Sequence, residues 1–319
     1  MKIKTIYIKL IFTLLFGFNL NAQHLSFDGS NDYVSLGNRY SWGSAFSFQA
    51  WIKPSSSGNY ASNDAGLSIF ADGAQESAYR ANFALGLRNN VSGANGEIRL
   101  VAELGANSTH VNDDTQFPTD IWSHVVLTFD NGTVKFYING SLSSSKSAPV
   151  NNASNHSNGG NFIGQRMSTG STGSFPGLID EIGIWNEVLT DNEVSALYNS
   201  GNVLSLSSNS GNYNSSSGLQ GYFNFNDGSG STLTDQSSNN NNGTITGASW
   251  GTGNADRAVP TVTNVTSTTL DGTLKVGDVA AITVTFSEAV SVTGTPQLTL
   301  ETGSSDAVVD YTSGSGGTT

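Results

Sequence analysis

The sequence predicts an all-β protein that folds as a two-sheet sandwich with one short helix. Short segments in which apolar and polar residues alternate recur along the chain, and turn-forming residues separate them. The 319 residues include 37 glycines, and charged residues make up only 12% of the chain. This composition favours β-proteins, because their many turns need a positive φ or hydrogen bonds from side chains to the backbone.

Four stretches show the pattern most clearly. Residues 46–54 place their apolar side chains on one face, and residues 81–87 and 97–104 repeat this alternation. Residues 122–139 are predicted to form a hairpin that turns at Asn131-Gly132, since this dipeptide readily adopts a positive φ. The opposite face carries Ser47, Gln49, Trp51 and Lys53 in the first stretch and, as a wetter face, Glu97, Arg99, Val101 and Glu103 in the third.

The region from 178 to 201 predicts a buried strand followed by a helix. Apolar residues lie on both faces of 178–185, as in a strand that is covered on two sides. Thr190-x-x-Glu193 is a capping box that starts a helix, and Gly201 is expected to be its left-handed C-terminal cap. By contrast, residues 141–160 are polar and low in complexity, which predicts a long surface loop.

Four motifs in a fixed order carry a family resemblance. They are L-S-F-D-G-S-N-D-Y-V at 25–34, F-S-F-Q-A-W-I-K-P at 46–54, the hairpin at 121–140 and the strand with its helix at 175–201. Together they resemble the laminin-G-like, concanavalin A-like jelly-roll family over residues 24–201, which implies a two-sheet jelly-roll sandwich. Such jelly rolls occur as carbohydrate-binding modules, adhesion modules and glycosidase accessories, so the function must be argued from a site.

The two ends of the chain predict export and a second domain. Three lysines precede the apolar run 10–20, and a small residue before a polar one follows, so 1–22 is predicted to be a cleaved signal peptide of bacterial type. The run is shorter than the roughly 20 residues that a bilayer span needs. We therefore expect a secreted or cell-surface protein with no transmembrane span in the mature chain.

Residues 23–257 are predicted to form the jelly-roll domain. Its core is 24–201, and 218–250 either adds strands to the jelly roll or begins a second copy of it. Residues 258–319 resemble the start of a bacterial immunoglobulin-like repeat, but they supply about four strands where such a sandwich needs about seven. The chain is therefore predicted to end in a partial immunoglobulin-like domain and to be a fragment of a longer protein.

The charge balance narrows the class of partner. The net charge is −12 and the pI is near 4.5, with neither a basic patch nor a phosphate-binding loop, which argues against nucleic acid. There is no cysteine, so the sandwich has no disulfides. Abundant oxygen ligands make the chain compatible with calcium.

Asp180-Glu181 is the pair of residues that would suggest an enzyme. Glucanases with the jelly-roll fold need two carboxylates that project from one face of a strand. Strict alternation places Asp180 and Glu181 on opposite faces, so no second acid stands beside either one. The four histidines show no metal spacing, and no serine nucleophile motif accompanies them. The sequence therefore predicts that this chain is not an enzyme, and it leaves open whether the full-length protein carries catalytic residues beyond Thr319.

A calcium site is predicted where the turn after the first strand approaches Asp180. Asp28 and Asp32 lie in that turn, and Asp180 or Glu181 would complete the set of oxygen ligands. In the alternative, the two turn residues hydrogen-bond to their own backbone, and Asp180 or Glu181 pairs with Arg166.

Sugar binding requires an exposed aromatic ring beside hydrogen-bonding groups. The loop at 55–80 and a second loop offer such residues, whereas the tryptophans at 51, 122 and 185 are expected to pack inside the strands. The candidate ligand-binding residues are Tyr60, Asn63, Asp64, Tyr79, Arg80 and His110.

These observations predict a non-catalytic exported or cell-surface module. Its expected partner is an extracellular glycan, or a matrix or cell-surface protein. Two alternatives remain open: an accessory domain of a secreted glycoside hydrolase whose catalytic part lies elsewhere, and a purely structural spacer.

Overall fold

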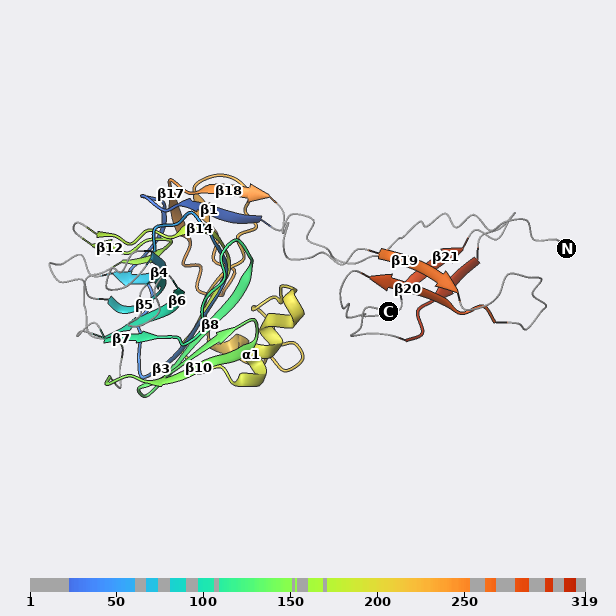
Figure 1. Cartoon of the computed structure of the whole chain (residues 1–319), viewed down its shortest axis with the longest axis horizontal. Helices are drawn as coiled ribbons and strands as arrows, with labels where there is room; N and C mark the ends of the chain where they lie inside the picture. Colours follow the sequence, from blue (N-terminus) through green and yellow to red (C-terminus); the bar gives the residue numbers. More distant parts are fainter. Residues whose placement is uncertain are drawn as a thin grey trace. The chain divides into compact units, whose positions relative to one another are not determined.

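A computed structural model describes residues 23–60, 67–73, 81–89, 97–105, 109–150, 153, 160–168, 171–252, 262–267, 279–286, 296–300 and 307–313. The chain divides into two compact units, one within residues 21–257 and the other beginning at Ala258 (Figure 1). The predicted signal peptide lies outside the described residues.

The first unit contains an eight-stranded antiparallel sheet, which we call the first sheet. Its strands follow the order β10-β9-β8-β3-β14-β1-β18, and β15 also pairs with β14. The bounds are β1 (Gln23–Asp28), β3 (Ala45–Pro54), β8 (Ser123–Asp130), β9 (Thr133–Ile138), β10 (Ser141–Ser147), β14 (Pro176–Trp185), β15 (Leu219–Phe223) and β18 (Ser249–Thr252).

A second sheet of eight strands has the order β16-β17-β2-β11-β4-β5-β6-β7. A small hairpin of β12 (Met167–Ser168) and β13 (Ser171–Thr172) accompanies it. The bounds are β2 (Tyr33–Gly37), β4 (Leu67–Gly73), β5 (Ala81–Asn89), β6 (Ile98–Leu104), β7 (Thr109–Asn112), β11 (Asn161–Ile163), β16 (Thr232–Leu233) and β17 (Gly243–Thr246).

The two sheets enclose one large hydrophobic core, as the alternation predicts. The apolar faces of β3, β5, β6, β8 and β9 all contribute to it, and Asn131 and Gly132 both have the positive φ expected of the hairpin turn. The expectation of a wetter outer face on β6 is wrong at Val101 and Glu103, which are buried. Glu103 is buried because the side chain of Arg166 lies over it and binds it.

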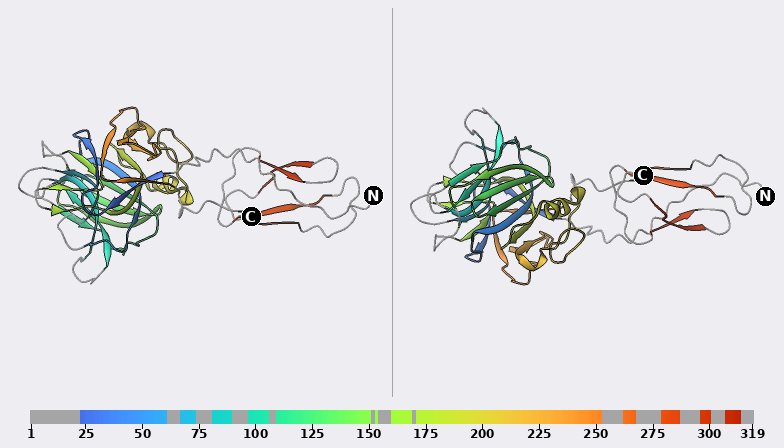
Figure 2. Two further views of the ribbon diagram at one scale, coloured as in Figure 1. Left: turned by 90° about the horizontal axis from the view of Figure 1, so that it is seen from above. Right: turned by 90° about the horizontal axis from the view of Figure 1, so that it is seen from below.

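One helix, α1 (Asp191–Tyr198), packs beside β10 on the outer side of the first sheet (Figures 1 and 2). Its capping box between Thr190 and Glu193 is confirmed. The left-handed cap is Asn199 and not Gly201, because the helix ends two residues earlier than expected. The 3-10 turns η1 (Asn199–Gly201) and η2 (Ser216–Gly218) follow it.

The outer face of the first sheet is covered by α1 and the chain that follows it. A second apolar cluster forms there from β8, β9, β14, α1 and the 204–222 segment. This cover explains why the outward-facing Gln49 and Trp51 are almost fully buried. Its members include Val126, Tyr137, Trp185, Leu189, Val194, Leu197, Leu206, Tyr213 and Tyr222.

Strands after the helix belong to the same sandwich. β15 pairs with β14, β17 with β2 and β18 with β1, so this part of the chain extends both sheets. The surface loop expected from Ser141 is wrong for its first part, since β10 pairs along β9 as an edge strand of polar residues. Most of the remaining expected loop lies outside the described residues.

The described part of the second unit consists of two hairpins. β19 (Val262–Ser267) pairs with β20 (Ile282–Phe286), and β21 (Gln297–Leu300) pairs with β22 (Ala307–Asp310). All five residues of β20 are half-buried. An immunoglobulin-like identity for this unit stays a prediction.

No helix in the described part of the chain combines the length and the apolar character that a membrane crossing requires.

Candidate functional site

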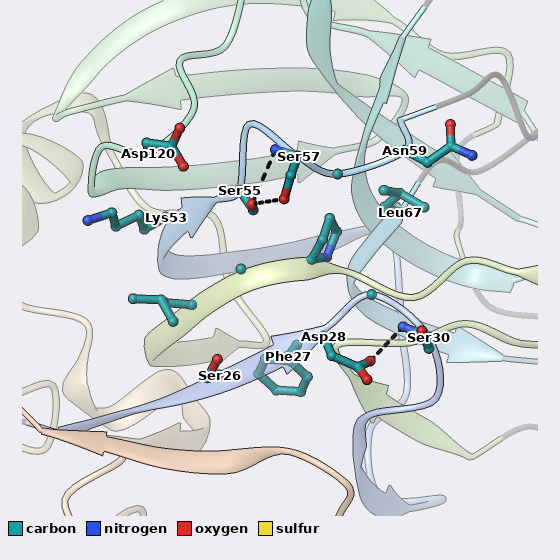
Figure 3. A pocket seen from close by; sticks show the side chains of 15 residues that line it. Ser26, Phe27, Asp28, Ser30, Lys53, Ser55, Ser57, Asn59, Leu67 and Asp120 are labelled. Atoms are coloured by element: carbon teal, nitrogen blue, oxygen red, sulfur yellow. Dashed lines mark hydrogen bonds between the residues drawn. The ribbon is translucent and has the colours of Figure 1, made fainter.

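A depression of about 780 Å³ lies where β1 ends and β14 begins (Figure 3). The end of β3, the loop that follows it, the residue at 120 and Leu67 on β4 complete its wall. The lining is mixed, with hydroxyl, amide and charged groups beside a few apolar side chains. The residues used below are Ser26, Asp28, Lys53, Ser57, Asp120 and Leu178.

The strand register places one row of this wall. Lys53 on β3 stands opposite Leu178 on β14, and Leu178 in turn stands opposite Ser26 on β1. Directly opposed residues share a face of the sheet, so these three side chains form a continuous row. A cation, an apolar group and a hydroxyl are thereby set side by side.

Glycine allows the chain to close tightly around the depression. Gly177 has a φ of 139°, and a Cβ there would lie 2.3 Å from the carbonyl oxygen of Lys53. At Gly58 a Cβ would lie 2.5 Å from Cγ of Pro176. Contacts this short exclude any side chain, so the lining keeps its shape only with glycine at both positions.

Asp120 is held in place at the rim of the depression. Its φ is 59°, and its backbone N–H donates to the carbonyl oxygen of Pro54 at 2.7 Å. Its Oδ1 accepts the backbone N–H of Ser56 at 3.1 Å. Hydrogen bonds from the Ser56 hydroxyl and N–H, and then the charge of Lys53, hold the pKa of Asp120 below its usual value. The carboxylate is therefore ionised and oriented at neutral pH.

Tyr60 does not supply the exposed ring that the sequence predicts. Its side chain is only 4% exposed, and its hydroxyl donates to the carbonyl oxygen of Ser55 at 2.8 Å. Burial raises the pKa of Tyr60 above its usual value. The ring supports the loop around the depression from below, since a Cβ on Gly58 would also collide with it. The other candidates of this loop, Asn63, Asp64, Tyr79 and Arg80, lie outside the described residues.

His110 lies on the other sheet, away from the depression. It stands on β7 opposite Glu103, and its Nε2 is 3.7 Å from Oε2 of Glu103. Both guanidinium NH groups of Arg166 also donate to Glu103. His110 therefore borders a buried ion pair, and the described structure does not bring it together with Tyr60.

The four predicted calcium ligands fall in two separate places. Asp28 pairs with Pro176 in the strand register, so it lies four residues, or about 13 Å, from Asp180 along β14. Oδ1 of Asp28 accepts the N–H of Ser30, and Oδ2 of Asp32 accepts the N–H of Asp28. Within the part of the chain that the structure describes, no three acidic or histidine side chains gather closely enough to share a metal ion. The set of four does not fit one calcium site.

The prediction that Asp180 and Glu181 face opposite sides of the sheet is wrong. Ile179 and Ile182 both point into the core, so the two residues between them both point outward. A bulge causes this, because β14 has two residues where β3 has only Ala50, and Glu181 has a φ of 51°. Oε2 of Glu181 accepts the hydroxyl of Tyr222 at 2.9 Å, within the cover of the outer face.

Because of the bulge, strand alternation no longer argues against a catalytic role for Asp180 and Glu181. Their burial argues against it instead. Asp180 is 2% exposed and Glu181 is 4% exposed. Burial raises the pKa of Tyr222, and the charges of Glu181 and Asp180 raise it further. All three groups therefore lie together beneath the cover of the outer face. A glycoside substrate has no access to carboxylates in this position.

Asp32 offers a direct test of the turn at 28–32. We expect Asp32→Ala to lower the free energy of unfolding by about 1 kcal/mol, because the N–H of Asp28 loses its acceptor. Asp32→Asn keeps an oxygen at this position and should lose less. Urea denaturation measures both. A melting temperature that rises with calcium in the wild type and no longer does so in Asp32→Asn would show a metal role instead.

Sequence reasoning missed Lys53, Asp120 and Ser57 as lining residues. Lys53 sits in a strand motif, and nothing near Asp120 in the sequence marks it as part of a site. The run Ser55-Ser56-Ser57-Gly58-Asn59 carries the signal of a turn, and it begins the loop at 55–80 from which the sequence predicted other residues as ligands. Hydrogen bonds from Asp120 to Pro54 and from Ser56 to Asp120 join these segments in the folded chain.

Comparisons with known proteins find several chains that are similar to this one. A putative carbohydrate binding protein from Bacteroides ovatus has a similar structure, with a TM-score of 0.54 and 19% identity over 74% of this chain and 61% of that one. Domain 4 of the extracellular arabinanase AbnA from Geobacillus stearothermophilus gives a TM-score of 0.41 and 23% identity over 54% and 75% of the two chains. Among curated proteins, adhesion G-protein coupled receptor V1 of Danio rerio is 31% identical over 104 residues.

That receptor match covers 30% of this chain and only 2% of the receptor. The family model described as the concanavalin A-like lectin/glucanases superfamily matches residues 28–195, which is more than half of the chain. The family match and the two-sheet sandwich lead to the same assignment: the chain belongs to the concanavalin A-like lectin/glucanases superfamily.

Proposed function

We propose that the first unit is a non-catalytic carbohydrate-binding module that works outside the cell. Its superfamily includes lectins, and the similar structure from Bacteroides ovatus is described as a putative carbohydrate binding protein. The signal-peptide pattern of residues 1–22 supports export. These three observations favour extracellular carbohydrate binding, and the depression is the proposed binding site.

The depression is the observation that carries the proposal. Sugars present hydroxyl groups at their edges and C–H groups on their faces, so a binding site needs polar and apolar groups side by side. The lining offers Lys53, Asp120 and four serine side chains for hydroxyl groups, and Leu178 for C–H groups. Glycine and the ordered Asp120 fix this arrangement before any ligand arrives, which lowers the entropic cost of binding.

Carbohydrate binding is also compatible with the other partners that the sequence predicts. A matrix or cell-surface protein would be recognised through glycans that it carries, and an accessory module of a glycoside hydrolase would use the same depression on its substrate. Calcium would belong to the turn at Asp28 and Asp32, because Asp28 borders the depression, whereas the carboxylate of Glu181 is buried and bound by the hydroxyl of Tyr222.

Filling the depression tests the proposal. Ser57 is exposed and lines the depression, so Ser57→Trp should block it with little effect on the fold. We expect the wild-type chain to bind members of a glycan array and Ser57→Trp to lose at least tenfold in affinity by isothermal titration calorimetry. Ser145→Trp is the matched control, because Ser145 is exposed on the edge strand β10. Equal binding by wild type and Ser57→Trp would rule out this site.

A further inference from the structure

Two opposite charges stand together at one end of the depression. Lys53 and Asp120 lie at that end, and Asp28, Ser30 and Asn59 lie at the other (Figure 3). The charge of Lys53 acts on the carboxylate of Asp120, so the two groups are within electrostatic reach of each other. Lys53 is a donor of hydrogen bonds and Asp120 is an acceptor. Both residues line the same end of the depression, so this end presents a donor and an acceptor with no net charge.

Asp120 retains capacity for a ligand. A carboxylate has about four lone-pair sites, and the described donors to Asp120 are the N–H and the hydroxyl of Ser56. These bonds orient the group without exhausting it. The side chain is also well exposed, so a ligand can reach the remaining sites.

We propose that the depression binds a neutral sugar residue and that Lys53 and Asp120 form hydrogen bonds with two adjacent hydroxyl groups of this sugar. This inference rests on the proposed function. One hydroxyl donates to the Asp120 carboxylate, and the neighbouring hydroxyl oxygen accepts from the Lys53 ammonium. Hydrogen bonds to charged groups are stronger than those between neutral groups, so this pair supplies most of the specificity.

The remaining lining completes the fit to a neutral sugar. Leu178 stands next to Lys53 in the strand row and offers an apolar surface to the C–H face of the ring. Pro176 also lines the depression and adds to this surface. No exposed aromatic ring is among the described lining residues, so the aliphatic side chains take the place of ring stacking.

The charges around the depression disfavour an acidic sugar. The described lining contains one cation, Lys53, and two carboxylates, Asp28 and Asp120. A uronate, sialate or sulfate group would meet an excess of negative charge, and Lys53 already has Asp120 beside it. A neutral ligand meets no such repulsion, and salt should change its affinity little.

The test compares neutral and acidic oligosaccharides on the full chain by isothermal titration calorimetry. The neutral probes are gluco-, galacto-, manno-, xylo- and arabino-oligosaccharides, and the acidic probes are oligogalacturonate, sialyllactose and a sulfated oligosaccharide. We expect a neutral probe to bind best, with an affinity that is unchanged between low and high salt. Asp120→Asn and Lys53→Met should each weaken that binding about tenfold or more.

Matched controls are available at a distance. Asp130 is exposed and pairs with Ala45, eight residues and about 26 Å along β3 from Lys53, so Asp130→Asn should bind as the wild type does. Lys146 lies on the edge strand β10 and forms an ion pair with Asp114, so Lys146→Met controls for the loss of a lysine. Melting temperatures confirm that all four variants are folded.

Three results would overturn the inference. If acidic probes bind best and Asp120→Asn strengthens them, the ligand is an anion held by Lys53. If neutral probes bind and Ser57→Trp abolishes binding while Asp120→Asn and Lys53→Met do not weaken it, the proposed function stands and the hydroxyl-reading pair is wrong. If no probe of either class binds, both the proposed function and the inference fall.

Discussion

Arg166→Met is expected to lower the free energy of unfolding of the jelly roll by about 3–5 kcal/mol. The guanidinium is 4% exposed and holds the carboxylate of Glu103, which is fully buried, with one N–O distance of 3.0 Å. Removing the cation leaves this carboxylate without its main counter-charge in a poorly solvated place. His110 is farther away, at 3.7 Å, and lies at the edge of the sheet, so it does not replace both guanidinium bonds.

Urea denaturation followed by tryptophan fluorescence measures this loss. All five tryptophans lie between residues 42 and 250, so the signal reports on the first unit only. The double variant Arg166→Met with Glu103→Gln should recover about 2 kcal/mol or more, because the stranded charge is then gone. A loss below about 1 kcal/mol in the single variant would show that solvent reaches Glu103 and that the pair contributes little.

Asp235→Ala is expected to cost about 2–4 kcal/mol of stability. Asp235 is 3% exposed, and its two carboxylate oxygens accept three backbone N–H groups. These belong to Tyr222 on β15, to Ser237 and to Asn241 in the Asn-rich loop. The single side chain thus ties this loop to the sheet, and alanine would leave the buried N–H of Tyr222 without an acceptor.

Two further variants separate this effect from a general loss of charge. Asp235→Asn keeps the oxygen that faces Tyr222 and Ser237, so its loss should be smaller. Asp227→Ala removes an aspartate that is bound only by Thr234 among the described contacts and is exposed, so we expect a cost of about 1 kcal/mol or less. Equal losses in Asp235→Ala and Asp227→Ala, measured by the same denaturation, would contradict the role given to Asp235.

Local patterns in the sequence predicted the elements well. The apolar residues of β3, β5 and β6 enter the core, the hairpin turns at Asn131 and Gly132, and Thr190 caps α1. Each of these features depends on residues that are near one another in the chain. Side-chain period, turn preference and helix capping are all decided at that range.

The positions that local patterns predicted wrongly depend on long-range contacts. Asp180 and Glu181 share a face because of a bulge against β3, and Tyr60 is buried because its ring belongs to the hydrophobic core cluster. Alternation assumes an unbroken ladder, and the exposure of a loop residue depends on what packs against it. Neither condition can be read from neighbouring residues.

The sequence by itself determined that this protein is a β-sandwich of the concanavalin A-like superfamily, because strand period and motif order are local properties. Only the tertiary structure decided where a ligand could bind. The depression joins Ser26, Lys53, Asp120 and Leu178 from four separate segments. The register of β1, β14 and β3 brings Ser26, Leu178 and Lys53 together, and hydrogen bonds with Pro54 and Ser56 hold Asp120 beside them. Register is set by the packing of whole strands against a common core, so no single segment contains it.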